Sequence, residues 1–133
     1  MTVEVFNMKQ MFVYTAIATH STGVDVLNGH VTTSFTPLNG DTPKLKTQNT
    51  RAEVAYVSRV EYFPKADVTV ALVESETAWE DYDYYQRIGF TYDHEFRPHI
   101  TLRKGDCVKE YEHLAGELVV MGEAYIGFLE LNK

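Results

Sequence analysis

The sequence is poor in cysteine, in positive charge and in long apolar runs, and each shortage excludes a class of protein. Cys107 is the only cysteine among 133 residues, so no intramolecular disulfide can form and a reducing cytoplasm is the expected compartment. No apolar run approaches the roughly 20 residues that cross a bilayer, and the first residues lack the basic and apolar segments of a signal peptide. We therefore expect a cytoplasmic protein with no membrane partner.

Basic residues are scarce relative to acidic ones. Twelve lysines and arginines against 19 aspartates and glutamates give a formal net charge of −7. A protein that grips duplex nucleic acid through its phosphates needs the opposite balance. The composition therefore favours a small phosphorylated ligand or a short oligonucleotide, for which a local cluster of donors is enough.

The remaining composition suits one globular domain spanning residues 1–133. The chain is 44% hydrophobic and 23% charged, enough to bury a single core. Alternating and β-branched residues predict strands over 11–19, 30–36, 52–63, 66–74, 98–102, 117–121 and 124–131. This succession of strands, with one or two helices, indicates the α+β class.

Two helices and one long loop are predicted between the strands. Ser75 is a suitable N-cap for a helix that reaches about Ile88 and ends at Gly89, and residues 106–114 favour a shorter one. Trp79, Tyr82 and Tyr85 follow helical spacing, which predicts core packing. The polar segment 38–51 predicts a surface loop, a candidate lid.

Two short stretches, residues 30–32 (His-Val-Thr) and 99–101 (His-Ile-Thr), carry the strongest functional signal. Alternate residues of a strand face the same side, so each His projects together with its Thr, and the apolar residue between them points into the core. Two imidazoles and two hydroxyls facing one pocket supply the groups that hold a phosphate and move a proton on either side of it. One such stretch alone is compatible with an ordinary edge-strand histidine.

The duplicated His-x-Thr resembles the signature of the two-histidine (2H) phosphoesterase superfamily. The second copy carries most of the likeness, because the run from Tyr92 to Leu102 (YDHEFRPHITL) is similar to the family's aromatic-Arg-Pro-His-hydrophobic-Thr-Leu segment. The first copy departs from the pattern at Thr33, where the family often has an apolar residue. Length and the aromatic approach to the second motif look most like the phage anti-CBASS cyclic-oligonucleotide phosphodiesterases.

The resemblance implies a fold and an activity. The fold is a bilobal, pseudo-two-fold LigT-like arrangement in which antiparallel sheets line a central cleft and one or two helices lie outside. The activity is metal-independent and cofactor-free hydrolysis of cyclic di- or oligonucleotide signals in the host cytoplasm. The implied catalytic residues are His30, Thr32, His99 and Thr101, with the imidazoles as acid and base and the hydroxyls on the phosphoryl oxygens.

Metal chemistry is not expected from the residues themselves. The carboxylates lack the clustered spacing of a hard-cation site, and two histidines without a third ligand make a poor zinc site.

Further candidate contacts with substrate are Tyr14, Tyr92, Phe96, Arg97 and Glu123. The aromatic residues are candidates because base–aromatic stacking contributes about 1–3 kcal/mol per base, although each also fits a core position. Arg97 is either a phosphate contact or an exposed loop arginine. Glu123 resembles in position an acidic residue of the phage enzymes, and a solvated turn glutamate is the alternative.

Two other functions remain open from the sequence. One is an RNA 2′,3′-cyclic phosphodiesterase of the LigT-like type, whose known members are longer than this chain. The other is a protein that sequesters a cyclic nucleotide without turning it over. Intact histidines in both motifs favour catalysis, because sequestration needs no proton donor opposite a proton acceptor.

Overall fold

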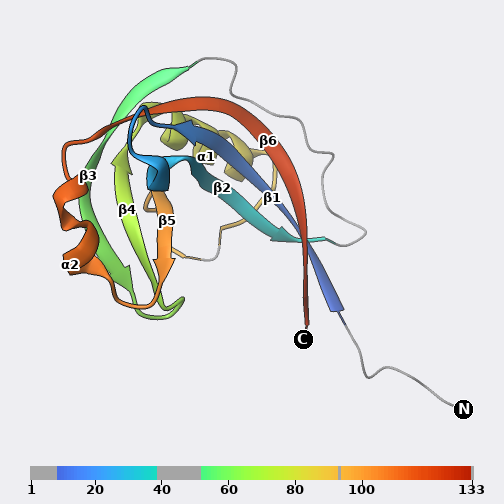
Figure 1. The fold of residues 1–133 in the computed structure, drawn as a ribbon. Coiled ribbons are helices and arrows are strands. Elements are labelled where there is room, and N and C mark those ends of the chain that lie inside the picture. Colours follow the sequence, from blue (N-terminus) through green and yellow to red (C-terminus); the bar gives the residue numbers. More distant parts are fainter. Residues whose placement is uncertain (1–8, 39–51, 93, 133) are drawn as a thin grey trace, which may run out of the picture.

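The alternating segments build a single six-stranded antiparallel sheet in the computed structural model, which describes residues 9–38, 52–92 and 94–132 (Figure 1). The strands are β1 (Lys9–His20), β2 (Gly29–Pro37), β3 (Glu53–Phe63), β4 (Val68–Glu74), β5 (His99–Lys104) and β6 (Leu118–Asn132). The helices are α1 (Glu76–Arg87), the one-turn α2 (Val108–Tyr111), and two 3-10 turns, η1 (Asp25–Leu27) and η2 (Glu112–Leu114). The α+β class is thereby confirmed.

The edges of this sheet come together. The strand order is β2-β1-β6-β3-β4-β5, so β2 and β5 lie at opposite edges. The sheet nevertheless curls until these two strands contact each other, and Figure 1 shows β6 as a long arc across the other strands. A Cβ placed on Gly29 would lie only 3.5 Å from Cγ2 of Ile100. The two His-x-Thr strands, at opposite ends of the six-stranded order, are therefore neighbours in space.

The core lies on one face of the curled sheet. Val31 of β2 and Ile100 of β5 belong to the same buried cluster, at 0% and 1% exposure. Ala78 of α1 and Leu114 of η2 join that cluster, so the helices cover this face. The prediction that the middle residue of each His-x-Thr points into the core is confirmed.

Helix α1 begins and ends where the sequence predicts. The Ser75 hydroxyl accepts a hydrogen bond from the Ala78 N–H at 3.0 Å, and Gly89 adopts φ +103° just past the helix end, a conformation that favours glycine. The Glu53 carboxylate adds to the cap by accepting from the Ser75 hydroxyl at 2.6 Å and from the Glu76 N–H at 2.9 Å. Helix α1 is therefore anchored to β3 at its first turn.

Three predictions about elements need correction. The two closing strands predicted around Gly122 are one strand, β6, whose pairing with β1 shifts register between Ile17 and Thr19. Gly122 and Glu123 therefore form a bulge and not a turn. The helix predicted over 106–114 is divided into α2 and η2. In the aromatic stripe, Tyr85 is fully buried but Trp79 is 45% exposed, so core packing is wrong for Trp79.

The predicted loop over 38–51 falls almost entirely outside the described residues, of which only Leu38 belongs to it.

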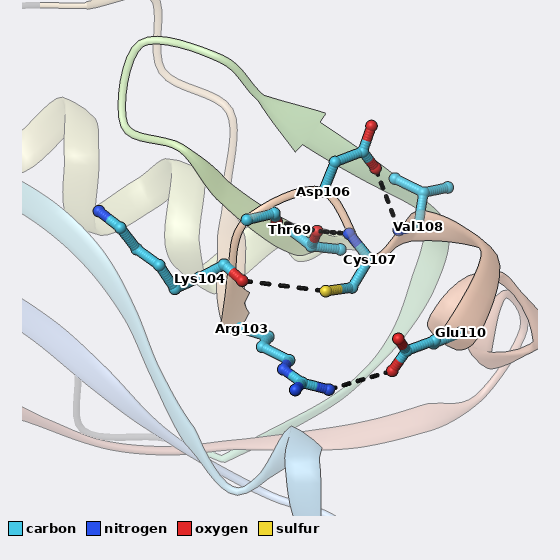
Figure 2. Close-up of polar contacts among 8 residues, drawn as sticks. Thr69, Arg103, Lys104, Asp106, Cys107, Val108 and Glu110 are labelled. Atoms are coloured by element: carbon cyan, nitrogen blue, oxygen red, sulfur yellow. Dashed lines mark hydrogen bonds and ion pairs between the residues drawn. The ribbon is translucent and has the colours of Figure 1, made fainter.

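The turn that follows β5 is tied to β4 by the buried Thr69. Its hydroxyl donates to the Gly105 carbonyl and accepts from the Cys107 N–H, both at 2.7 Å (Figure 2). The Cys107 thiol faces the Lys104 carbonyl at 3.8 Å, and Cys107 is the N-cap of α2. The interpretation of Cys107 as a packing residue beside a helix agrees with this placement.

Candidate active site

The first motif lies on the face of β2 opposite the core. His30 pairs with Ala18 of β1, and Thr32 pairs with Ala16. Paired residues of an antiparallel ladder point to the same side, so two small alanines flank the imidazole and the hydroxyl. His30 is exposed and Thr32 is half-buried. This geometry leaves both groups accessible to a ligand.

The second motif lies on the same face at the other edge of the sheet. His99 pairs with Leu72 of β4, and Thr101 pairs with Val70. His99 is half-buried and Thr101 is exposed. Because β2 and β5 contact each other, the structure brings the four predicted residues of the two motifs to one region of one face.

The environment of His99 fixes its ring. Its Nδ1 lies 2.7 Å from the Arg97 carbonyl oxygen, and a carbonyl only accepts, so Nδ1 carries the proton. The neutral ring therefore keeps a free lone pair on Nε2. The ring also makes a T-shaped contact with Phe63, with centroids 4.9 Å apart and planes at 73°. An imidazole held in one tautomer is suited to accept a proton at Nε2.

Burial lowers the pKa of His99, and the positive charges of Arg97 and His30 lower it further, against the hydrogen bond from Nδ1, which acts to raise it. The effect of the His30 charge on His99 agrees with the contact between β2 and β5, which brings the two motifs together. Burial likewise lowers the pKa of His30. Both rings therefore favour the neutral form in the absence of an anion.

Two tyrosines surround His30. The ring centroid of Tyr14, from β1, is 6.4 Å from that of His30, and Tyr125, from β6, is 6.3 Å away. The two tyrosines meet edge to face at 6.3 Å. Tyr14 was a candidate from the sequence, whereas Tyr125 was missed because the bulge at Gly122 and Glu123 shifts the alternation of β6.

Gly127 explains why Tyr14 takes this position. Gly127 of β6 pairs with Tyr14, and a Cβ on Gly127 would collide with the Cζ, Oη and Cε1 atoms of that ring. The tyrosine ring therefore lies across the strand, in space that only glycine leaves open.

The remaining candidates occupy different places. Phe96 is 4% exposed and stacks on Tyr82 of α1 at 4.3 Å, and Tyr92 lies edge-on to Phe96 at 5.4 Å. The structure places both rings in an aromatic cluster against α1 and does not bring them to the face of the histidines. A base-stacking role for Phe96 does not fit this burial.

Arg97 and Glu123 remain near the site face. The Arg97 guanidinium binds Glu61, with Nη2 2.8 Å from one carboxylate oxygen and 2.9 Å from the other. Glu123 is exposed and lies in the β6 bulge opposite Ala18, the residue that pairs with His30. Arg97 is therefore occupied by a carboxylate, whereas Glu123 faces solvent beside the first motif.

Within residues 9–38, 52–92 and 94–132, no three His, Cys, Asp or Glu side chains cluster closely enough to hold a metal ion. Their helices are too short and too polar to span a bilayer.

Comparison with known protein families gives a match over most of the chain. A family model described as "Anti-CBASS protein Acb1" matches residues 13–133, a span that contains both His-x-Thr motifs. No curated protein and no solved structure matches the chain.

Proposed function

The chain belongs to the Anti-CBASS protein Acb1 family, and from this premise we propose that it hydrolyses cyclic di- or oligonucleotide signals by acid–base catalysis between His30 and His99. Family membership supports a role in viral counter-defence against cyclic oligonucleotide signalling, in the cytoplasm of the host. The observation that carries the catalytic part is the meeting of the two sheet edges, which puts both motifs on one face. Sequestration alone would not need an imidazole in each motif.

In this proposal His99 is the general base. Its Nδ1–H is held by the Arg97 carbonyl, so Nε2 is free to take the proton of an attacking water as the new O–P bond forms. Burial keeps its pKa low, together with the charges of Arg97 and His30, which favours the neutral form that a base needs. The tautomer is thus preset before substrate binds.

His30 is then the general acid. It is the more exposed of the two rings, and a bound phosphate raises the pKa of a nearby imidazole by stabilising its charged form. His30 gives its proton to the leaving ribose oxygen as the old O–P bond breaks, and solvent exchange restores both rings. Thr32 and Thr101 donate hydrogen bonds to the non-bridging oxygens, where negative charge develops.

We also infer that the chain is a 2H phosphoesterase with the pseudo-two-fold arrangement of that superfamily. The strand order supports this, because β2-β1-β6 and β3-β4-β5 each place a His-x-Thr strand at the outer edge. The two halves are joined through β6 and β3, which pair over Glu53–Tyr56 and Leu118–Met121.

Incubation with cyclic di- and trinucleotides in excess chelator, followed by chromatography of the products, tests the proposal. We expect the wild type to yield linear products. His30→Ala and His99→Ala should each lose about 100-fold or more in rate, since a positioned acid or base contributes about 10²–10⁴-fold. His113→Ala is the matched control, because that histidine is exposed on η2 and should leave the rate unchanged.

Other outcomes would replace the proposal. Turnover of a nucleoside 2′,3′-cyclic phosphate alone would indicate an RNA-end phosphodiesterase. Thermal stabilisation by a cyclic nucleotide without any product would indicate sequestration. Full activity in either histidine variant would remove the acid–base assignment.

A further inference from the structure

We propose that Arg97 is a positioning residue for His99, braced by Glu61 and Phe63, and not a contact for the substrate phosphate. The catalytic consequence rests on the proposed function, because it acts through the proposed base. The positioning itself is a property of the free protein and is measurable without substrate.

The Arg97 side chain already binds two residues of β3. Its Nη2 reaches both oxygens of Glu61, at 2.8 and 2.9 Å, and its Cζ lies 5.3 Å from the centroid of the Phe63 ring, a cation–π distance. Glu61 and Phe63 are two residues apart on β3 and therefore face the same side. Binding a phosphate with Arg97 would require the loss of this ion pair.

The Arg97 backbone is equally restrained. A residue that precedes proline is confined to extended conformations, and Pro98 is buried with its carbonyl accepting from the Val73 N–H at 2.9 Å. The Arg97 carbonyl, which accepts the His99 Nδ1–H, is thus held on one side by β4 and on the other by its own side chain.

Phe63 contacts both Arg97 and His99. One contact is with the Arg97 guanidinium at 5.3 Å, and the other is the edge-to-face contact with the His99 ring at 4.9 Å. The imidazole is therefore held by a hydrogen bond at Nδ1 and by an aromatic wall. Both restraints involve Arg97, because its carbonyl accepts the hydrogen bond and its guanidinium packs on Phe63.

The charges around His99 allow a positioning role of Arg97 to be distinguished from a role in packing alone. Arg97 and His30 are the cationic groups that lower the pKa of His99, and Glu61 pairs with Arg97. Releasing Arg97 removes one cation and loosens the carbonyl, so the ring should populate the Nε2–H tautomer as well. A role confined to stability would leave the tautomer unchanged.

The test is ¹⁵N chemical shifts of the His99 ring at a pH above its titration, read in the full chain. We expect a single Nδ1–H tautomer in the wild type and a mixture in Arg97→Met, with Glu61→Gln as a milder second variant. Arg59→Met is the matched control, because Arg59 also pairs with Glu61 but is largely exposed and lies on β3, away from the backbone that precedes His99. It should retain the wild-type tautomer.

Turnover of a cyclic dinucleotide supplies the second readout. We expect kcat to fall about 10- to 100-fold in Arg97→Met, by analogy with the loss seen when the groups that orient a metal-bound histidine are removed, with KM changed less than about twofold. Arg97→Lys should recover part of kcat, because it retains the charge for Glu61. Raised KM with an unchanged tautomer would overturn the proposal and return Arg97 to phosphate binding.

The two proposals fail separately. If the wild type is inactive but its His99 has a single Nδ1–H tautomer, and Arg97→Met has a mixture, the positioning role stands and the hydrolase proposal falls. If the wild type is active and the His99 tautomer is the same in Arg97→Met and Arg59→Met, the hydrolase proposal stands and the positioning role falls.

Discussion

At the scale of single residues, the site depends on positions that carry no chemistry of their own. Gly127 leaves room for the Tyr14 ring, which lies 6.4 Å from the His30 ring. Sequence alternation is sufficient to predict which way His30 and Thr32 point, because a strand has a period of two. It is insufficient for Tyr125, since the bulge in β6 changes the phase of the pattern.

If Tyr14 stacks on a base of the substrate, as the sequence predicts, Gly127→Ala should weaken substrate binding. The added methyl collides with the ring, and loss of a stacked base, worth about 1–3 kcal/mol, corresponds to roughly 5- to 150-fold in affinity. Titration of the His99→Ala protein with a cyclic dinucleotide, with and without Gly127→Ala, measures this effect without turnover.

A double-mutant cycle supplies the control for Gly127. If the effect passes through the tyrosine, Gly127→Ala should change affinity little in a protein that already carries Tyr14→Ala. An equal loss in that background would mean that the substitution distorts β6 itself.

At the scale of elements, the sequence predicts those whose signals are local. The Ser75 cap and the Gly89 stop fix α1, and both are visible in a short window. The continuity of β6 through Gly122 depends on pairing with distant strands, and no local signal marks the division of 106–114 into α2 and η2. A glycine between two apolar runs fits a turn and a bulge equally well until the partners are known.

Glu53 is an element-scale contact that sequence does not reveal, because β3 and α1 meet only in the fold. Burial acts to raise its pKa, but hydrogen bonds from Ser75, Glu76 and Thr77 outweigh this, and the pKa is lowered overall. A lowered carboxyl pKa stabilises the folded state above the unfolded pKa, and that stability is lost as the pH falls through the folded value.

Glu53→Ala should cost about 0.5–2 kcal/mol of unfolding free energy at pH 7, as other N-cap losses do. The deficit should shrink towards pH 3, because the wild-type carboxylate is being protonated there. Urea denaturation at the two pH values measures it, with the exposed Glu112 changed to Ala as control. A deficit of equal size at both values would assign the effect to packing instead of charge.

At the scale of the whole molecule, the curling of the sheet brings the two motifs together. This curling is the feature least predictable from the sequence. Contact between β2 and β5 requires five strand pairings to form and the sheet to curl, and no local pattern encodes that closure. The duplicated motif points to convergence only through its resemblance to a known family. Residue identity was therefore predictable, whereas the geometry that unites the residues was not.

The pH dependence of global stability provides a test at this scale, because α1 carries a buried acid. Asp81 is 1% exposed, and its Oδ2 has no hydrogen-bond partner among the described residues. Burial, with a smaller effect of the Glu80 charge, raises the pKa of Asp81 from 3.8 to about 7. Between these values the unfolded chain releases a proton that the folded chain keeps, so stability falls as the pH rises.

Asp81→Asn should remove this loss, which amounts to roughly 4 kcal/mol at most when each pKa unit is 1.36 kcal/mol. Relative to wild type, the variant should gain stability between pH 4 and pH 8, measured as the difference in unfolding free energy from urea titrations. Taking the difference cancels the histidines, whose lowered pKa values act in the opposite direction. Asp83→Asn, on the exposed side of the same helix, should give a difference that is flat with pH. If Asp81→Asn is equally flat, Asp81 is ionised in the folded protein and α1 holds a buried charge against the sheet.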